Sequence, residues 1–287
     1  MKGRIVQSSP SIIIPALNEA HHLAELLPQI HAQTLRPREI LVADAGSTDA
    51  TREVATACGA RLVRGGRPAA GRNSGAREAA SDWLCFIDAD TRLPAADLLA
   101  RVMAEAERSC LSALVCDYRP YYRPGDRGFD RWPLRLWDRL MLRAVSDAQR
   151  VSARFGFPVG QAVFLATRSE VFGRLGGFDE EAEPFEDSAY LLKVHQGCSC
   201  PPGRRSAVGV MPSSCFVHVS TRRYDVLGRL VFPSSMVVRG ALVRWAGRRE
   251  RPDHGYWDVN RLELYRERRS NGPGDGGDHS PDPGRRC

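Results

Sequence analysis

The sequence predicts an α/β fold in which a mostly parallel central sheet is flanked by helices on both faces. Apolar runs of strand length occupy residues 11–14, 39–43, 60–63 and 83–87, and each ends in a polar or glycine-containing turn. The segments between these runs place apolar residues at helical spacing. Strands that alternate with helices build right-handed β-α-β units, and such units produce a parallel sheet.

Apolar stripes between the strands predict the helices of the first half. They fall at Leu23, Leu26, Leu27 and Ile30, at Val54, Ala55 and Cys58, and at Leu98, Leu99, Val102 and Met103. Thr48 or Asp49 is the predicted N-cap of the second helix, because short polar side chains accept the unpaired N–H groups of a first turn. The third helix is expected to start near Pro94.

The second half has a different pattern. Residues 119–155 begin as an aromatic loop punctuated by proline and glycine and continue as an amphipathic helix. The apolar side of this helix carries Trp137, Leu140, Met141 and Ala144. We predict that side to be its packing face, with stacking of the aromatic residues on a sugar as the alternative. The elements that follow are a strand at 159–167, a helix opened by Glu186 and Asp187, and one or two short strands within 208–219.

Composition and charge restrict the class of protein. The 287 residues are 43% hydrophobic and 26% charged, which is typical of a soluble globular protein. No apolar run approaches the roughly 18 residues that a membrane-spanning helix needs, and the apolar part of the N-terminus is too short for a secretory signal. A cytoplasmic location is therefore expected. The net charge of +7 and the pI near 9.2 favour anionic partners such as phosphates.

The C-terminal part is expected to be organised differently. Residues 231–270 are predicted to form a basic helical segment, and residues 271–287, rich in glycine, proline and aspartate, a disordered tail. The basic stretch 227–250 could lie on the anionic inner face of the cell membrane as a peripheral contact. A plain packing helix with its arginines in solvent explains the same stretch equally well.

Polar clusters follow three of the predicted strands. They occupy residues 15–19, 44–49 and 88–90. In parallel sheets, ligands bind just beyond the carboxyl ends of the strands, so these clusters are expected to share one rim. The aspartates of the third cluster, Asp88 and Asp90, have a structural alternative, because they and Thr91 could cap the helix near Pro94.

Six motifs occur in an order that resembles one enzyme family. They are IIIPALNEA at 12–20, LVADAGSTDAT at 41–51, GRNSGAREA at 71–79, FIDADT at 86–91, GGFDE at 176–180 and FEDSAY at 185–190. Together they resemble the inverting glycosyltransferases of family 2, and in particular a bacterial subgroup, with the nucleotide-binding fold called GT-A. The match extends from about residue 10 to 230. It departs from the common pattern at Ala45, where many relatives carry a second aspartate.

The resemblance implies an activity and a division of the chain. The expected reaction is transfer of a sugar, with a UDP-sugar as the expected donor, to a hydroxyl of a carbohydrate or lipid-linked acceptor with inversion. Residues 1–118 would form the nucleotide-sugar half of a single GT-A domain, and residues 119–230 its acceptor and catalytic half.

A divalent metal ion, Mn²⁺ or Mg²⁺, is the expected cofactor. Such hard cations prefer oxygen ligands and keep phosphates and water in their coordination shell. The resemblance assigns Asp90 of the DXD-like motif to the metal and Asp88 to the nucleoside. His218 is predicted as an additional ligand, since a neutral imidazole serves many divalent ions; a structural histidine is the alternative.

Further residues are predicted to hold the donor nucleotide. Pro15, Asn18 and Glu19 shape the first loop, and Asp44 is expected to accept a hydrogen bond from a base N–H unless it only stabilises an Asx-turn. The resemblance places Asn73 near the donor. The neighbouring Arg72 could attract a phosphate at the start of its helix, with a solvated surface arginine as the alternative. Arg222 and Arg223 could clamp the diphosphate.

Asp187 is the predicted general base. Inversion requires in-line attack by an acceptor hydroxyl, and a carboxylate opposite the leaving diphosphate can take its proton. Glu186 is expected to raise the basicity of Asp187 by like-charge repulsion. A simple capping role for both acids is the alternative.

Two other functions remain as alternatives. A sugar-1-phosphate nucleotidyltransferase shares a similar sheet but would need a glycine-rich loop after the first strand, where this chain has PALNEA. A non-catalytic basic binding protein would show a basic recognition helix or an exposed aromatic sheet, and the sequence has neither. No nucleic-acid partner is therefore expected.

Overall fold

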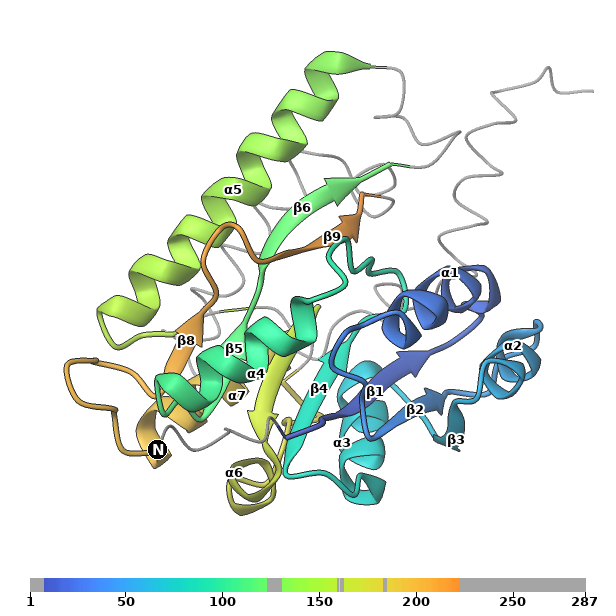
Figure 1. The fold of residues 1–287 in the computed structure, drawn as a ribbon, viewed down its shortest axis with the longest axis horizontal. Coiled ribbons are helices and arrows are strands. Elements are labelled where there is room, and N and C mark those ends of the chain that lie inside the picture. Colours follow the sequence, from blue (N-terminus) through green and yellow to red (C-terminus); the bar gives the residue numbers. More distant parts are fainter. Residues whose placement is uncertain (1–7, 123–130, 159, 161–162, 183–184, 222–287) are drawn as a thin grey trace, which may run out of the picture. The chain divides into compact units, whose positions relative to one another are not determined.

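The computed structural model describes residues 8–122, 131–158, 160, 163–182 and 185–221, all of which belong to one compact unit of the chain. These residues form the predicted α/β fold: a seven-stranded, mostly parallel sheet between helices, and a separate two-stranded sheet (Figure 1). The predicted segments 231–270 and 271–287, and most of the stretch 159–163, lie outside the described residues.

The large sheet joins both halves of the described chain. Its strands are β1 (Ser11–Ala16), β2 (Glu39–Asp44), β3 (Arg61–Arg64), β4 (Trp83–Ile87), β5 (Ala113–Val115), β7 (Phe164–Arg168) and β8 (Val208–Val210). They lie in the order β3-β2-β1-β4-β7-β5-β8. The strands β1 to β4 run parallel, whereas β7 runs antiparallel to both β4 and β5. Through β7, the second half of the chain lies directly against β4.

A small second sheet lies beside the longest helix. Its strands, β6 (Asp117–Tyr121) and β9 (Phe216–Ser220), pair in parallel. The helix α5 (Trp132–Arg154) packs against β6 (Figure 1).

Helices cover both faces of the large sheet, as predicted. The first face buries Ile12 and Ile14 of β1 under α1 (Ala20–His31), α2 (Thr51–Ala57) and α4 (Leu98–Arg108). The opposite face buries Ile13 under α3 (Pro68–Glu78), α6 (Ser169–Arg174) and α7 (Glu186–Gly197). Alternation along β1 sends successive isoleucines to opposite faces, and both faces are apolar, as expected for a strand inside a parallel sheet.

Two predicted helix starts are wrong. The helix α4 begins at Leu98 rather than near Pro94, and its N-cap residue is Asp97. Ala50, not Thr48 or Asp49, is the N-cap residue of α2, although Asp49 still accepts a hydrogen bond from the Thr51 N–H at 3.0 Å. One backbone N–H group in the first turn of α4 finds its hydrogen-bond acceptor outside the helix: the Leu99 N–H donates to Oε1 of Gln33 at 3.1 Å.

The predicted packing face of α5 is wrong in part: Met141 packs against the core, but Trp137 and Leu140 do not. Leu140 is 58% exposed and Trp137 is 42% exposed. The buried residues of this helix are instead Asp138, Leu142, Ser146 and Gln149. Three of these are polar and find hydrogen-bond partners on β6 and in the segment after it. Leu142, with Met141 and Val145 beside it, packs against the hydrophobic core, so polar and apolar contacts together anchor α5.

Among the described residues, no helix combines the length and the apolar character needed to cross a membrane.

Candidate functional site

The loops that follow β1 and β2 are fastened to each other by Asn18. Its backbone N–H donates to the Ser47 hydroxyl at 2.9 Å, and its side-chain oxygen accepts from the Thr48 N–H at 2.8 Å. Asn18 has a positive φ of 54°, a conformation that asparagine tolerates better than most residues. The polar clusters after these two strands therefore share one rim, as predicted.

Asp44 lies at the end of β2 and takes part in the turn that follows. Its Oδ1 accepts from the Ser47 N–H at 3.1 Å, and its Oδ2 lies 3.7 Å from Nε of Arg52. The side chain is only 9% exposed. Asp44 thus stabilises the turn after β2 through the N–H three residues on rather than two, so the contact is not an Asx-turn, and a role in nucleoside binding remains a prediction.

The other residues of the first loop have structural partners as well. The Glu19 carboxylate pairs with His22 in the first turn of α1, and the Glu19 N–H donates to the Thr51 hydroxyl at 2.8 Å. Pro15 is half-buried within β1. Both residues thus shape the rim, and their direct contact with a nucleotide stays a prediction.

The acidic pair after β4 does not cap a helix. Asp88 and Asp90 directly follow the buried strand, whereas α4 begins only at Leu98. The capping alternative is therefore wrong for Asp88, Asp90 and Thr91. Both aspartates are partly open to solvent, at the same end of the sheet as the Asn18 loop.

A buried arginine joins this acidic pair to the start of α7. Nη2 of Arg72 donates to Oδ1 of Asp88 at 2.6 Å, and Nη1 donates to Oε1 of Glu186 at 2.9 Å. The Arg72 and Glu186 side chains are 4% and 3% exposed. Burial acts to lower the pKa of Arg72, but the carboxylates of Asp88, Glu186 and Asp187 outweigh it and raise that pKa above its ordinary value. The alternative of a solvated surface arginine is wrong.

Asn73 holds the GGFDE loop. Its amide donates to the Phe178 carbonyl and to Oε1 of Glu180, both at 2.9 Å, and its oxygen accepts from the Phe178 N–H at 2.9 Å. A Cβ on Gly177, which has a φ of +66°, would lie 2.7 Å from the Asn73 side-chain oxygen. Since α3 begins at Pro68, Asn73 lies inside the helix and not at its start. The structure gives it a clear structural role, and its place near the donor remains a prediction.

Asp187 lies in the first turn of α7, beside the bridge made by Arg72. Its Oδ1 accepts from the Ser188 N–H at 2.7 Å, and the Ser188 hydroxyl donates to the Gly160 carbonyl at 2.9 Å. The N-cap residue of α7 is Phe185, without a side-chain cap. Arg72 lies against Glu186, the neighbour expected to raise the basicity of Asp187, and that effect of Glu186 remains a prediction.

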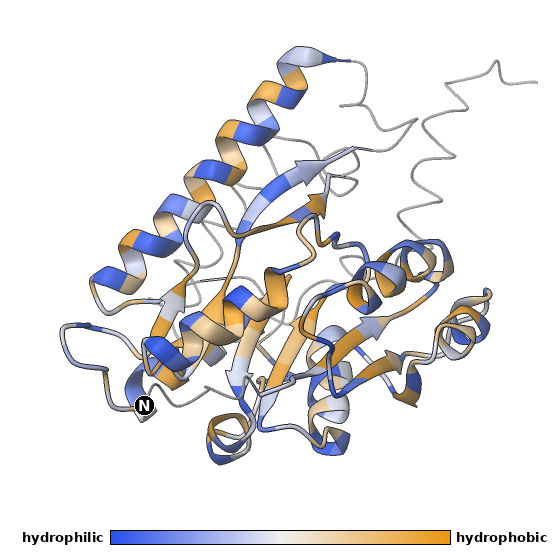
Figure 2. Cartoon of the chain, viewed as in Figure 1, coloured by the Kyte–Doolittle hydropathy of each residue, from blue (hydrophilic) through white to orange (hydrophobic). Residues whose placement is uncertain are grey.

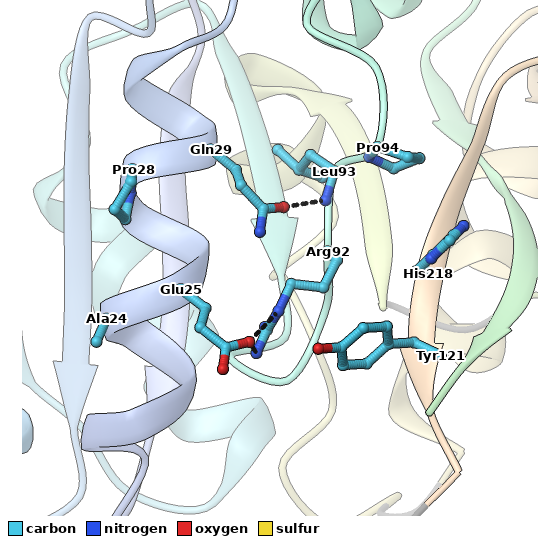
Figure 3. Close-up of a pocket in the computed structure, with 9 residues that line it drawn as sticks. All are labelled: Ala24, Glu25, Pro28, Gln29, Arg92, Leu93, Pro94, Tyr121 and His218. Carbon is cyan, nitrogen blue, oxygen red and sulfur yellow. Dashed lines mark hydrogen bonds and ion pairs between the residues drawn. The ribbon is translucent and has the colours of Figure 1, made fainter. Parts of the chain in front are cut away.

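His218 lies on β9 and lines a pocket of about 580 Å³ (Figure 3). The other lining residues are Ala24, Glu25, Pro28, Gln29, Arg92, Leu93, Pro94 and Tyr121. Glu25 pairs with Arg92 across this pocket, with Nε donating to Oε2 at 2.8 Å. Burial, helped by the nearby charge of Arg119, lowers the pKa of His218 below its ordinary 6.5. The His218 backbone pairs with that of Arg92, two positions after Asp90, with N–H···O distances of 2.9 Å in both directions. A metal site shared by His218 and Asp90 remains a prediction.

The residues after β4 fit a hard divalent cation. No group of three or more His, Cys, Asp or Glu side chains that could hold a metal ion occurs among the described residues. A site of one or two carboxylates completed by substrate phosphates and water is the usual arrangement for Mg²⁺, and Asp88 and Asp90 provide that chemistry. Nε of Arg72 and Oε2 of Glu186 are buried there without a hydrogen-bond partner, so the site still has polar groups to satisfy.

The bridge of Arg72 and Glu186 is the part of the site that sequence reasoning missed. These residues are 114 positions apart, and no local pattern signals their contact. The motifs that contain both residues were the available signal. Arg222 and Arg223 lie outside the described residues.

Comparison with known proteins agrees with this geometry. Residues 11–173 match the family model described as glycosyl transferase family 2. A PGL/p-HBAD biosynthesis glycosyltransferase of Mycobacterium bovis (strain BCG / Pasteur 1173P2) is 40% identical over 102 residues, which are 33% of this chain and 40% of that protein. The chain thus spans about two fifths of the length of this curated relative.

Solved structures of glycosyltransferases share the fold. Residues 1–349 of S. aureus TarS, in complex with UDP-GlcNAc, superpose with a TM-score of 0.55 at 16% identity, over 74% of this chain and 58% of that one. The mannosyltransferase PcManGT from Pyrobaculum calidifontis, in complex with GDP-Man and Mn²⁺, gives a TM-score of 0.54 at 19% identity, over 94% and 82% of the chains. At such identities the likeness shows the fold, which is GT-A.

Proposed function

Because this chain belongs to glycosyl transferase family 2, we propose that it transfers a sugar from a nucleotide diphosphate sugar to an acceptor hydroxyl, with inversion at the anomeric carbon. The observation that carries the proposal is the buried Arg72, which binds Asp88 at the end of β4 and Glu186 at the start of α7. It holds the proposed base, Asp187, beside the rim where the donor would bind. The family match favours this function over a nucleotidyltransferase or a non-catalytic protein.

The donor would lie across the loops after β1, β2 and β4. Asp44 would accept a hydrogen bond from the base, Asp88 would contact the ribose, and Pro15, Asn18 and Glu19 would form the wall of the nucleoside site. We propose UDP as the nucleotide, a choice supported by the UDP-GlcNAc complex of TarS, while the GDP-Man complex of PcManGT makes GDP the competing choice. An aspartate can accept an N–H from uracil or guanine alike.

Asp90, helped by Asp88, would hold a divalent cation together with the donor diphosphate. When bound, Mn²⁺ or Mg²⁺ would neutralise the diphosphate and stabilise it as a leaving group. The PcManGT complex with Mn²⁺ supports the choice of ion. Arg72 keeps one Asp88 oxygen fixed, which orients the carboxylate toward its remaining partners.

Asp187 would act as the general base. Its position in the first turn of α7 is fixed by the Arg72–Glu186 pair on one side and by the contact of Ser188 with Gly160 on the other. A base held in this way can take the proton of an acceptor hydroxyl as the anomeric carbon is attacked. The acceptor itself is proposed only as a carbohydrate or a lipid-linked hydroxyl.

The substitution Asp187→Asn tests the base. Turnover of a UDP-sugar, followed as UDP release with water or a simple sugar as acceptor, should fall about 10²–10⁴-fold, while calorimetric binding of UDP with Mn²⁺ should be retained. Glu170→Gln, an exposed acid at the start of α6, is the control and should behave like the parent protein. Near-normal turnover of the Asp187 variant would show that another group takes the proton. NMR of the product must show the inverted anomer, and a retained anomer would contradict the mechanism.

A further inference from the structure

The inner side of α5 is unusually polar. The Tyr122 hydroxyl donates to Oδ2 of Asp138 at 3.2 Å, the Tyr118 N–H donates to the Ser146 hydroxyl at 3.3 Å, and Nε2 of Gln149 donates to the Tyr118 hydroxyl at 3.1 Å. These contacts fasten the helix to β6 and to the residue after it. Only a few apolar residues of the helix, Leu142 with Met141 and Val145, pack against the core, and its other large apolar residues are exposed.

The outer side of α5 exposes large apolar residues. Trp132 is 74% exposed, Leu136 47% and Leu140 58%. These residues are four positions apart, so they form one continuous stripe along the helix. Figure 2 shows apolar and hydrophilic residues alternating along the whole length of α5. Grouped exposed residues of this kind, unlike single ones, mark a surface that another partner covers.

Arginines are interleaved with this stripe. Arg131, Arg139 and Arg143 are exposed, and we call them, together with Trp132, Leu136, Trp137 and Leu140, the α5 outer face. The one acid in the first three turns of the helix, Asp138, is buried. Farther along, Asp147 pairs with Arg143 at 3.7 Å and with Arg150 at 2.9 Å. The outer face thus combines apolar area with an excess of positive charge.

We propose that the α5 outer face binds the surface of a membrane that contains anionic lipids. Helices that lie in a membrane interface combine an apolar face with tryptophan, phenylalanine or leucine and a polar face rich in lysine or arginine, and the exposed side of α5 carries residues of both kinds. The 23 residues of α5 form a rod about 35 Å long, and the helix lies on the surface without crossing it. Tryptophan prefers this boundary because its ring is apolar and its N–H is polar.

The positive charge of the α5 outer face favours an anionic membrane over two other possible partners, a second copy of the chain and the stretch 222–250. A second copy of the chain would bring arginine against arginine at the same face. The stretch 222–250 of this chain is basic as well, with arginine at 222, 223, 229, 239, 244, 248 and 249 and acid only at Asp225 and Glu250. An anionic surface is complementary to the α5 outer face, and neither of these alternatives is.

Vesicle sedimentation of the full chain tests the proposal independently of sugar transfer. The protein should sediment with phosphatidylcholine vesicles that contain phosphatidylglycerol and much less with phosphatidylcholine alone. The double variant Leu136→Ser/Leu140→Ser should bind the anionic vesicles at least about tenfold more weakly, because two exposed leucines are lost. Arg139→Gln/Arg143→Gln should weaken binding by a similar factor and reduce its salt dependence.

The matched control is Phe155→Ser/Phe157→Ser, which removes two residues that are 61% and 54% exposed just beyond the end of α5. It should bind vesicles like the parent protein, and all variants should bind UDP normally. Absence of vesicle binding by the parent protein, or equal losses in the control, overturns the proposal. Unchanged binding of both α5 variants also overturns it and moves the contact to residues 227–250. Loss of a dimer in the leucine variant without any vesicle binding assigns the face to a second copy.

Discussion

At the scale of single residues, Arg72 has the largest influence on the site. It is almost completely buried, yet it contacts two carboxylates that come from opposite halves of the described chain. If Arg72 contacted only one of these carboxylates, the other carboxylate would lack a positively charged partner. The three groups together form a fixed arrangement, which is what a site needs when it must hold one carboxylate near a donor and another near an acceptor.

We expect Arg72→Met to lower the free energy of unfolding by about 3–5 kcal/mol, because it leaves the buried Glu186 without its partner. The chain contains a matched control. Arg61 also joins two carboxylates, Glu39 at 3.2 Å and Glu78 at 2.6 Å, but its side chain is 48% exposed. Arg61→Met should therefore cost under about 1 kcal/mol. Urea unfolding of both variants makes the comparison, and equal losses would show that burial of the Arg72 bridge is not what gives it its energetic weight.

At the scale of elements, the start of the sheet is held together by Glu39. This residue opens β2, and its Oε1 accepts from the Ser11 hydroxyl of β1 and from the Ala80 N–H after α3, both at 2.7 Å. Its Oε2 pairs with Arg61 of β3. Burial acts to raise the pKa of Glu39, but the hydrogen bonds from Ala80, Ser11 and Arg61 prevail and lower it below its ordinary 4.5.

A lowered pKa gives this contact a defined pH dependence. The charged form is favoured in the folded state, so its contribution is complete above pH 4.5 and is lost as the pH falls through the lower, folded-state pKa. Glu39→Gln should therefore cost about 1–2 kcal/mol at neutral pH, and the difference from the parent protein should shrink in acid. Urea unfolding at a series of pH values measures it, with the exposed Glu170→Gln as control. A difference that stays constant down to acid pH would rule out the ionised Glu39 as its source.

The strands of this fold could be predicted from the sequence better than the starts of its helices. The strands β1, β2, β3 and β4 were found because alternating or continuous apolar runs are local signals. The start of α4 was misplaced because side chains of α1 and of the segment after it decide it: Oε1 of Gln29 in α1 accepts from the Leu93 N–H at 2.8 Å, and Oε1 of Gln33, just after α1, accepts from the Leu99 N–H. Leu93 is thereby held in the connecting segment, several residues before the first turn at Leu98.

Some residues of the candidate site could be predicted from the sequence and others could not. The rim residues Asn18, Asp44 and Asp88 could be predicted, since each follows a recognisable strand. The Arg72–Glu186 bridge could not, because it joins α3 to α7 across 114 positions. The exposure of Trp137 and Leu140 on α5 was equally hidden, because hydrophobic periodicity does not tell which apolar residues of a helix another element will cover.

At the scale of the whole described fold, one sheet carries both sets of site residues. The strand β4, which ends at Ile87 just before Asp88, pairs with β7, and α6 follows β7 directly. The donor rim and the proposed base are therefore connected through one sheet. A ligand that binds this rim is expected to stabilise the core as a unit and to shift its thermal transition.

We expect UDP together with Mn²⁺, at about 100 times the dissociation constant, to stabilise the folded protein by about 2.7 kcal/mol. For a domain of this size, that gain raises Tm by about 5–10 °C. Asp90→Asn should remove the part of the shift that depends on Mn²⁺, since Asp90 is the proposed ligand. His218→Asn should remove a smaller share of it, because His218 is predicted only as an additional ligand and lies beside Arg92, two positions after Asp90. Differential scanning fluorimetry of the three proteins with UDP, GDP and dTDP, each with and without Mn²⁺, measures these effects. A Mn²⁺-dependent shift that survives in the Asp90 variant and disappears in the His218 variant would transfer the metal site to β9.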